Sequence, residues 1–118
     1  MNNGKWNFRR SEHTIELDPP PGTDPAVGNA LWDFITAEIG ESEKNLNYYR
    51  GIWARISTDP EAAREGISGN GTHQHIEGDD VVLEALYDQW ETVRIPKEQF
   101  EQFLDQFADY LKESEQRS

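Results

Sequence analysis

The spacing of apolar residues changes along the chain and divides the sequence into segments. Residues 5–10 and 13–17 alternate between large and polar side chains, which predicts two short strands in one edge ribbon. The prolines that follow Asp18 end this ribbon, because proline fixes φ and offers no N–H group to a sheet. Residues 1–22 are therefore expected to form an N-terminal ribbon and a proline-rich turn.

Helical spacing dominates residues 23–67. Thr23 and Asp24 before Pro25 are a helix start signal, because a side-chain oxygen there can cap the first turn and a proline at this position loses no hydrogen bond. Gly40 can end this helix. The apolar stripe of the helix consists of Val27, Leu31, Phe34, Ile35 and Ile39.

Two further helical signals follow in the same segment. Apolar residues at helical spacing favour a helix over residues 41–57, with a strand as the alternative. Thr58 and Glu61 stand at capping-box spacing, so a short helix is expected over residues 60–65. The glycine-rich run 68–71 then indicates a turn.

Beyond that turn, residues 72–95 have the two-residue period of antiparallel strands, at 72–77, 81–87 and 91–95. A three-residue loop at 88–90 would pair Leu83 with Ile95 and leave one largely apolar face. A two-residue turn would put charge on both faces. We therefore expect the first register.

The last segment, residues 96–113, is expected to be a long amphipathic helix that begins at Pro96. Residues 113–118 are expected to fray. Together the segments predict an α+β fold, in which an antiparallel sheet of about three to five strands packs against about two to four helices. The apolar stripe of the last helix consists of Phe100, Phe103, Leu104, Phe107 and Leu111.

Composition adds a single-domain size and a strong negative charge. The chain has 118 residues, with 23 Asp and Glu against 11 Lys and Arg, for a net charge of −12. This balance disfavours nucleic acid and anionic membranes and favours a basic protein partner. There is no Cys and no long apolar run, so disulfides and thiolate metal sites are excluded and a cytoplasmic location is expected. The oligomeric state stays open.

Little in the sequence indicates catalysis. So acidic a chain contains many pairs of neighbouring carboxylates by chance. Such pairs are therefore not evidence for acid–base catalysis. The sequence has no glycine-rich phosphate loop, no nucleophile elbow and no Walker-type lysine. We therefore expect neither an enzyme nor a cofactor.

His73 and His75 form the one pattern that suggests a metal site. Residues two apart on a strand point to the same face, so both imidazoles could bind one ion, with Glu77 or His13 as a third ligand. Two exposed strand histidines are the more ordinary interpretation. The pair could also make binding depend on pH.

The densest acidity lies between Glu77 and Glu91, a stretch without Lys or Arg. Like charges across a sheet cost stability, which favours a role in binding over a simple solvated face. Trp90 stands in the predicted turn, where it is either a binding residue or folded back over the sheet. The predicted partner-binding residues are Glu77, Asp79, Asp80, Glu84, Tyr87, Asp88, Trp90 and Glu91.

A longer part of the C-terminal half resembles a known class of proteins. The acidic strand 77–86, the Tyr-Asp-x-Trp-Glu turn at 87–91 and the Ile-Pro-x-Glu-x-Phe helix entry at 95–100 resemble small immunity proteins of bacterial toxin systems, including contact-dependent growth inhibition and polymorphic toxins. The resemblance covers roughly residues 72–112. It implies a cytoplasmic protein that binds one cognate toxin domain, often a nuclease, and blocks its active site.

Other functions fit the same composition. Carboxylates can imitate the phosphates of DNA, so a DNA mimic that inhibits DNA-binding proteins is one alternative. A metal-binding protein that uses His73 and His75 is another. An adaptor with an ordinary acidic surface is the third.

Overall fold

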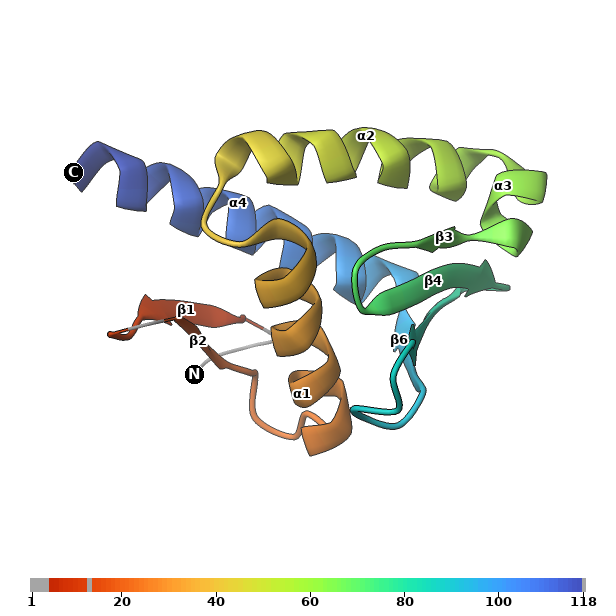
Figure 1. Ribbon diagram of the computed structural model, residues 1–118, viewed down its shortest axis with the longest axis horizontal. Coiled ribbons are helices and arrows are strands. Elements are labelled where there is room, and N and C mark those ends of the chain that lie inside the picture. Colours follow the sequence, from red (N-terminus) through yellow and green to blue (C-terminus); the bar gives the residue numbers. More distant parts are fainter. Residues whose placement is uncertain (1–4, 13, 118) are drawn as a thin grey trace.

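The computed structural model describes residues 5–12 and 14–117, and it has the α+β fold that the sequence predicted. In Figure 1, α2 and α4 run along one side of the molecule, and α1 lies between the N-terminal ribbon and the larger sheet. The elements are, in chain order, β1 (Asn7–Arg10), β2 (Ile15–Asp18), α1 (Pro25–Phe34), the π-helix η1 (Ile35–Ile39), α2 (Glu43–Thr58), α3 (Pro60–Glu65), β3 (Ile67–Ser68), β4 (Thr72–Glu77), β5 (Asp80–Ala85), β6 (Val93–Pro96) and α4 (Lys97–Arg117).

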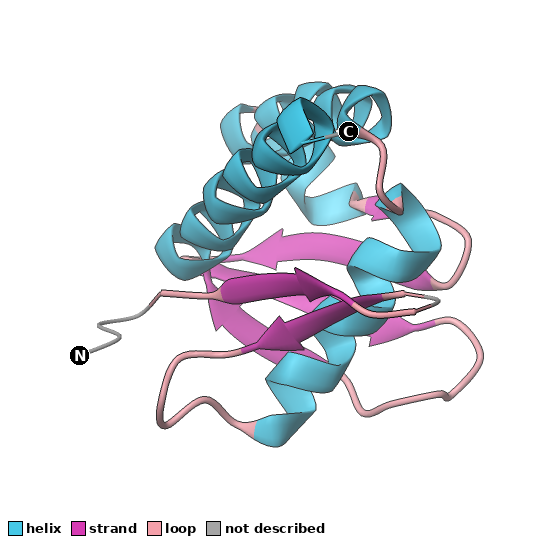
Figure 2. Ribbon diagram, turned by 90° about the vertical axis from the view of Figure 1, so that its left-hand side faces the viewer, coloured by secondary structure: helices cyan, strands magenta, loops and turns pink. Residues whose placement is uncertain are grey.

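The strands form two antiparallel sheets (Figure 2). β1 pairs only with β2, so the N-terminal ribbon is a sheet of its own and does not join the larger one. The larger sheet has the strand order β3-β4-β5-β6. Both α1 and α4 contact both sheets, and these two helices therefore hold the sheets together.

The predicted register of the β5–β6 hairpin is wrong by two residues. Leu83 pairs with Val93, and Val81 pairs with Ile95, because the loop between the strands spans residues 86–92 and not 88–90. On the β6 side the pairing stops at Leu83 and Val93, whereas on the β4 side the Leu86 amide still donates to Gly71 O at 3.0 Å. The predicted faces are nevertheless correct, since a shift of two residues keeps every side chain on the same face.

Capping side chains start the helices. Of the two predicted capping residues, Asp24 caps α1, because its Oδ1 accepts from the Ala26 amide at 2.9 Å, whereas the Thr23 hydroxyl donates to Pro20 O. The helix expected over residues 41–57 is confirmed by α2. The predicted cap of the short helix is wrong. Asp59 Oδ1 accepts from the Glu61 amide at 3.0 Å, whereas Thr58 is the last residue of α2 and its hydroxyl donates to Ala54 O.

The C-terminal helix α4 supplies much of the core. Its predicted apolar stripe is fully buried against α1, α2 and the inner face of the larger sheet. Pro96 ends β6 and does not begin the helix, and the helix continues past Glu113 to Arg117, where fraying was expected. Among the described residues, no helix is both long and apolar enough to cross a membrane.

Aromatic contacts attach the N-terminal ribbon to α4. The Trp6 ring meets Phe103 edge-on at a centroid distance of 5.1 Å, and Phe8 packs on Phe107 at 5.1 Å. The Trp6 amide also donates to Gln106 Oε1 at 2.6 Å. Offset and edge-on ring pairs are favourable beyond the area they bury, so these contacts hold the ribbon on the helix.

Candidate functional site

Much of the predicted acidic ribbon lies on the face of the larger sheet that points away from the helices. We call this the outer sheet face: His73, His75, Glu77, Asp80, Val82, Glu84 and Arg94. Val82 pairs with His75 on one side and with Arg94 on the other. It is only 3% exposed, because long cross-strand neighbours cover it.

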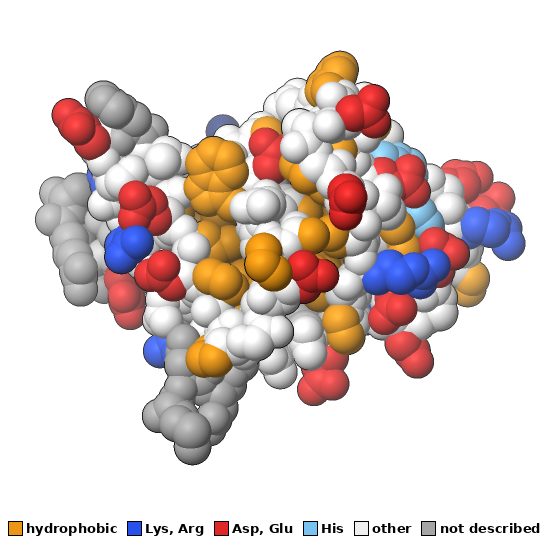
Figure 3. Space-filling view, turned by 90° about the horizontal axis from the view of Figure 1, so that it is seen from below, with side chains coloured by type: hydrophobic (Ala, Val, Ile, Leu, Met, Phe, Trp, Pro, Cys, Tyr) orange, Lys and Arg blue, Asp and Glu red, His pale blue; other side chains and the backbone are white. Residues whose placement is uncertain are grey.

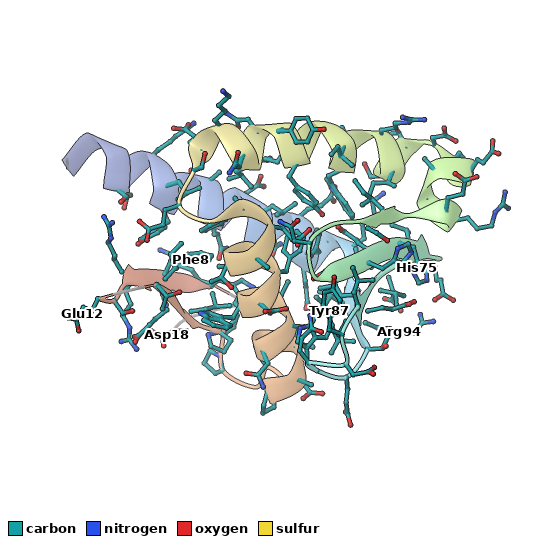
Figure 4. All side chains as sticks on the ribbon, viewed as in Figure 1. Phe8, Glu12, Asp18, His75, Tyr87 and Arg94 are labelled. Atoms are coloured by element: carbon teal, nitrogen blue, oxygen red, sulfur yellow. The ribbon has the colours of Figure 1, made fainter. Side chains whose placement is uncertain are left out.

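Arg94 and His75 lie close to the carboxylates of the outer sheet face. Arg94 approaches Glu77 Oε2 at 3.1 Å and Asp80 Oδ2 at 3.4 Å. The two ring nitrogens of His75 lie 2.9 Å from Glu77 Oε2 and 3.5 Å from Glu84 Oε1. Figure 4 shows His75 and Arg94 near each other on this side of the sheet. The expectation of uncompensated charge is therefore wrong for Glu77 and Asp80, which share Arg94, whereas Glu84 has only His75 as a partner among the described residues.

The pKa of Glu77 reflects this pairing. The hydrogen bond from His75, followed by the positive charge of Arg94, lowers the pKa of this carboxyl below its ordinary value. A lowered pKa means that the folded state favours the ionised form. The charges of the outer sheet face therefore serve partly to stabilise the sheet.

Side-chain hydrogen bonds attach the 86–92 loop to the rest of the molecule. Asp33 of α1 accepts from Gln89 Nε2 at 3.1 Å and from Trp90 Nε1 at 2.8 Å, both through Oδ2. Gln89 Nε2 also donates to Gly71 O at 2.8 Å, and Gln89 Oε1 accepts from the Tyr87 amide at 2.9 Å. The loop is thus fixed to α1 and to the β3–β4 turn.

The outer side of this loop carries exposed apolar groups beside carboxylates. Tyr87 is 75% exposed and Leu86 is 42% exposed. In the described part of the chain, the exposed Asp88 and Glu91 take part in no ion pair. Asp88 has a φ of 56°, a left-handed conformation that Asp tolerates better than most residues. Figure 3 shows the molecule from below, where hydrophobic side chains and Asp and Glu side chains are exposed on the same face.

Trp90 lies differently from its neighbours in the loop. Its ring is half-buried against the core, and its only polar group is bonded to Asp33. From the sequence, Trp90 was expected either to be a binding residue or to fold back over the sheet. The structure shows the folded-back position. Sequence reasoning missed Asp33, because nothing local links residues that lie 57 positions apart.

Asp79 belongs neither to the outer sheet face nor to the 86–92 loop. It is exposed in the tight turn between β4 and β5, after Gly78 with its φ of 61°. Its carbonyl accepts from the Lys97 amide at 2.8 Å, which joins this turn to the start of α4. The predicted binding residues thus fall into three places: the outer sheet face, the β4–β5 turn and the 86–92 loop.

His73 and His75 lie close together, but a ring nitrogen of each is bonded to another side chain, and the two rings are not arranged to bind one metal ion. The rings of His73 and His75 lie 5.7 Å apart, but His73 Nδ1 is bonded to Ser68 Oγ at 2.7 Å and His75 is bonded to Glu77. No group of three or more His, Cys, Asp or Glu that could hold a metal is found among the residues described. The other proposed ligand, His13, lies outside those residues.

Comparisons with protein-family models, with curated proteins and with solved structures found no match. A functional interpretation therefore depends on the geometry of the described residues and on the resemblance noted from the sequence.

Proposed function

We propose that this protein is an immunity protein that binds and neutralises a basic toxin domain, in particular a nuclease. One observation carries the proposal: the 86–92 loop is fixed by Asp33 and Gly71, yet it exposes Tyr87 and Leu86 between carboxylates that have no partner in the described part of the chain. The resemblance of residues 72–112 to immunity proteins points to the same class.

The loop has the physical properties of a binding site. An anchored loop loses little conformational freedom on binding, which leaves more of the contact energy as affinity. An exposed Tyr contributes contact area with few rotatable bonds, and Tyr is common among the residues that dominate binding energy. Asp88 and Glu91 would attract a cationic surface and speed its approach. A nuclease presents such a surface, since its groove must attract phosphates.

The alternatives have less support. A DNA mimic needs carboxylates that are free to replace phosphates, whereas Glu77, Asp80 and Glu84 are paired with Arg94 and His75. A metal-binding function would require His75 to exchange its carboxylate partners for an ion. Both alternatives stay measurable, by competition with DNA for unrelated DNA-binding proteins and by titration with zinc.

Two tyrosines with the same exposure provide the test. Tyr87 and Tyr48 are 75% and 76% exposed, but Tyr48 lies on α2. The chain is co-expressed with the C-terminal toxin domain encoded by the adjacent gene, and the dissociation constant is measured by calorimetry. Tyr87→Ala should weaken the complex by about 2 kcal/mol, or about thirtyfold, as expected for a dominant interface residue. Tyr48→Ala should leave it unchanged.

The result has clear alternatives. If the wild-type chain neither binds the neighbouring toxin domain nor protects cells from it, the immunity function is wrong. If binding occurs and both tyrosine variants bind equally well, the function stands but the 86–92 loop is not the interface. Circular dichroism on both variants checks that neither substitution disturbs the fold.

A further inference from the structure

A cavity of about 360 Å³ opens between α2, η1 and the strands β3 and β4. In Figure 1, β3 and β4 lie beneath α2, where this cavity is found. It shares no lining residue with the 86–92 loop, so a ligand in it would not occupy the proposed toxin interface. Its size is typical of small-molecule sites. Its apolar lining consists of Phe34, Tyr48, Tyr49, Ile52 and Ile67.

Two buried polar side chains that line this cavity each have one atom without a hydrogen-bond partner among the described residues. Thr72 and Gln74 are each only 2% exposed, and Thr72 Oγ1 and Gln74 Nε2 have no partner in the described part of the chain. Gln74 Oε1 accepts from the Tyr49 hydroxyl, which fixes the amide. Thr72 and Gln74 stand two residues apart on β4, so both side chains lie on the face that the helices cover.

Buried polar atoms of this kind lower the stability of the fold unless they form a hydrogen bond. A buried polar group without a hydrogen bond destabilises a fold by about 1–3 kcal/mol. Val and Leu would fill the same positions without this cost, and the other inner-face positions of the sheet use such residues, as at Leu83 and Val93. Local features that reduce stability are commonly found at functional sites.

Glu38 forms the polar end of the cavity and limits what can enter. Its carboxylate accepts from the Asn70 amide at 2.9 Å and from the Gly71 amide at 3.0 Å. A side chain at Gly69 would displace this carboxylate, because a Cβ there would lie 1.3 Å from Glu38 Oε2. Glu38 lies on the π-helix η1, an element that often occurs at functional sites. Its negative charge, in a chain whose net charge is −12, disfavours an anionic ligand.

We propose that this cavity binds a small, neutral, planar amide of about the size of a nucleobase. The amide carbonyl would accept from Gln74 Nε2, its N–H group would donate to Thr72 Oγ1, and the ring would lie against the aromatic and aliphatic wall. The ligand would thus satisfy the two polar atoms that the protein itself leaves unpaired.

The test uses probes of similar shape and different polarity: benzamide, benzoate and toluene. Each is titrated into the 15N-labelled protein, and chemical shifts are followed at Thr72 and at the Gln74 side-chain amide. Benzamide should give saturable shifts there. Benzoate should bind more weakly because of its charge, and toluene should bind more weakly because it cannot form the hydrogen bonds.

Variants then test the polar contacts. Thr72→Val removes the hydroxyl with little change of shape and should weaken benzamide binding by about fivefold, which corresponds to one neutral hydrogen bond. Thr58→Val, which removes an exposed hydroxyl at the end of α2, should not affect binding. The double variant Tyr49→Phe with Gln74→Met removes the amide without leaving the Tyr49 hydroxyl unpaired, and should abolish the preference for benzamide over toluene.

Each outcome decides the question. Saturable benzamide shifts that weaken in Thr72→Val and persist in Thr58→Val support the site. Equal binding of benzamide and toluene would show an apolar cavity only. No saturable shift, together with a lower Tm for Thr72→Val, would show a water-filled cavity only. Either of the last two results overturns the proposal.

Discussion

The outer sheet face and the 86–92 loop are both acidic, but their carboxylates have different surroundings. On the sheet, Arg94 and His75 lie within ion-pair distance of Glu77, Asp80 and Glu84, and Val82 between them is buried. On the loop, apolar groups are exposed beside carboxylates without such partners in the described chain. Charge density alone therefore does not identify a binding surface. Pairing with neighbouring residues must be known as well.

The difference arises from strand pairing. β5 has β4 on one side and β6 on the other, so its outward side chains meet His75 and Arg94 across the sheet. Among the described residues, no Lys, Arg or His forms an ion pair with Asp88 or Glu91 of the 86–92 loop. The loop is held instead by Asp33, which uses a carboxylate to accept from Gln89 and Trp90. The following predictions test whether this difference in surroundings is also a difference in function.

The largest effect is expected from removing the anchor of the loop. Asp33→Ala deletes the acceptor of the Gln89 and Trp90 hydrogen bonds and leaves the half-buried indole N–H unpaired. Hydrogen bonds to a charged group contribute about 1.5–3 kcal/mol, so we expect a loss of about 2 kcal/mol in the free energy of unfolding. Urea unfolding measures the loss. Amide hydrogen exchange should increase in residues 86–92 and not on the outer sheet face.

Asp109→Ala provides the control, because Asp109 is exposed on α4 and takes part in no ion pair in the described part of the chain. It should change the free energy of unfolding little. If Asp33→Ala proved as mild as Asp109→Ala, with unchanged exchange in the loop, then the contacts of Asp33 would not be what orders the 86–92 loop.

The fold was accessible from sequence wherever local signals were strong. The apolar stripe of α4, the Asp24 cap and the strand at 72–77 required only nearby residues. The hairpin register was not accessible, because residues 86–92 are held by contacts of Gln89 with Gly71 and with Asp33 of α1, which are distant in sequence. These contacts form only after the sheet and the helix have come together.

The sequence could predict which residues belong to the candidate site, but not how they are arranged. The sequence placed Tyr87 and Trp90 in one turn, but it could not indicate which of them would be exposed. That depends on Asp33, which binds the Trp90 indole and leaves Tyr87 in solvent. Likewise, the acidic stretch contains no cation of its own, and the pairing of Arg94 with Glu77 and Asp80 depends on the register between β5 and β6, which differs from the predicted one.

A smaller effect should separate the two acidic regions by their influence on binding. Asp88→Asn with Glu91→Gln removes two loop charges, and Glu77→Gln with Glu84→Gln removes two paired ones. The net charge changes equally, yet only the first double variant removes uncompensated carboxylates next to Tyr87. We expect its association rate with the toxin domain to fall by about fivefold at low salt, since steering depends on exposed charge near the interface.

Stopped-flow mixing at several salt concentrations measures these rates. The decrease in the logarithm of the association rate should be less than half as large for Glu77→Gln with Glu84→Gln as for Asp88→Asn with Glu91→Gln. Equal losses would mean that only net charge matters, and the distinction between the two regions would then have no consequence for association.

The smallest effect concerns acid stability on the outer sheet face. The folded state lowers the pKa of Glu77, chiefly through the hydrogen bond from His75 and then through Arg94. A carboxyl with a lowered folded-state pKa stabilises the fold above its unfolded pKa, and this contribution is lost as the pH falls through the folded-state value.

Carbon-13 NMR titration should therefore place the midpoint of Glu77 below the ordinary Glu value. His75→Gln should raise it most and Arg94→Gln less, whereas Arg50→Gln, which removes an exposed ion pair with Asp105, should leave it unchanged. An ordinary midpoint for Glu77 in the wild-type protein would mean that its carboxylate is as free as those of the loop, and the contrast between the two regions would disappear.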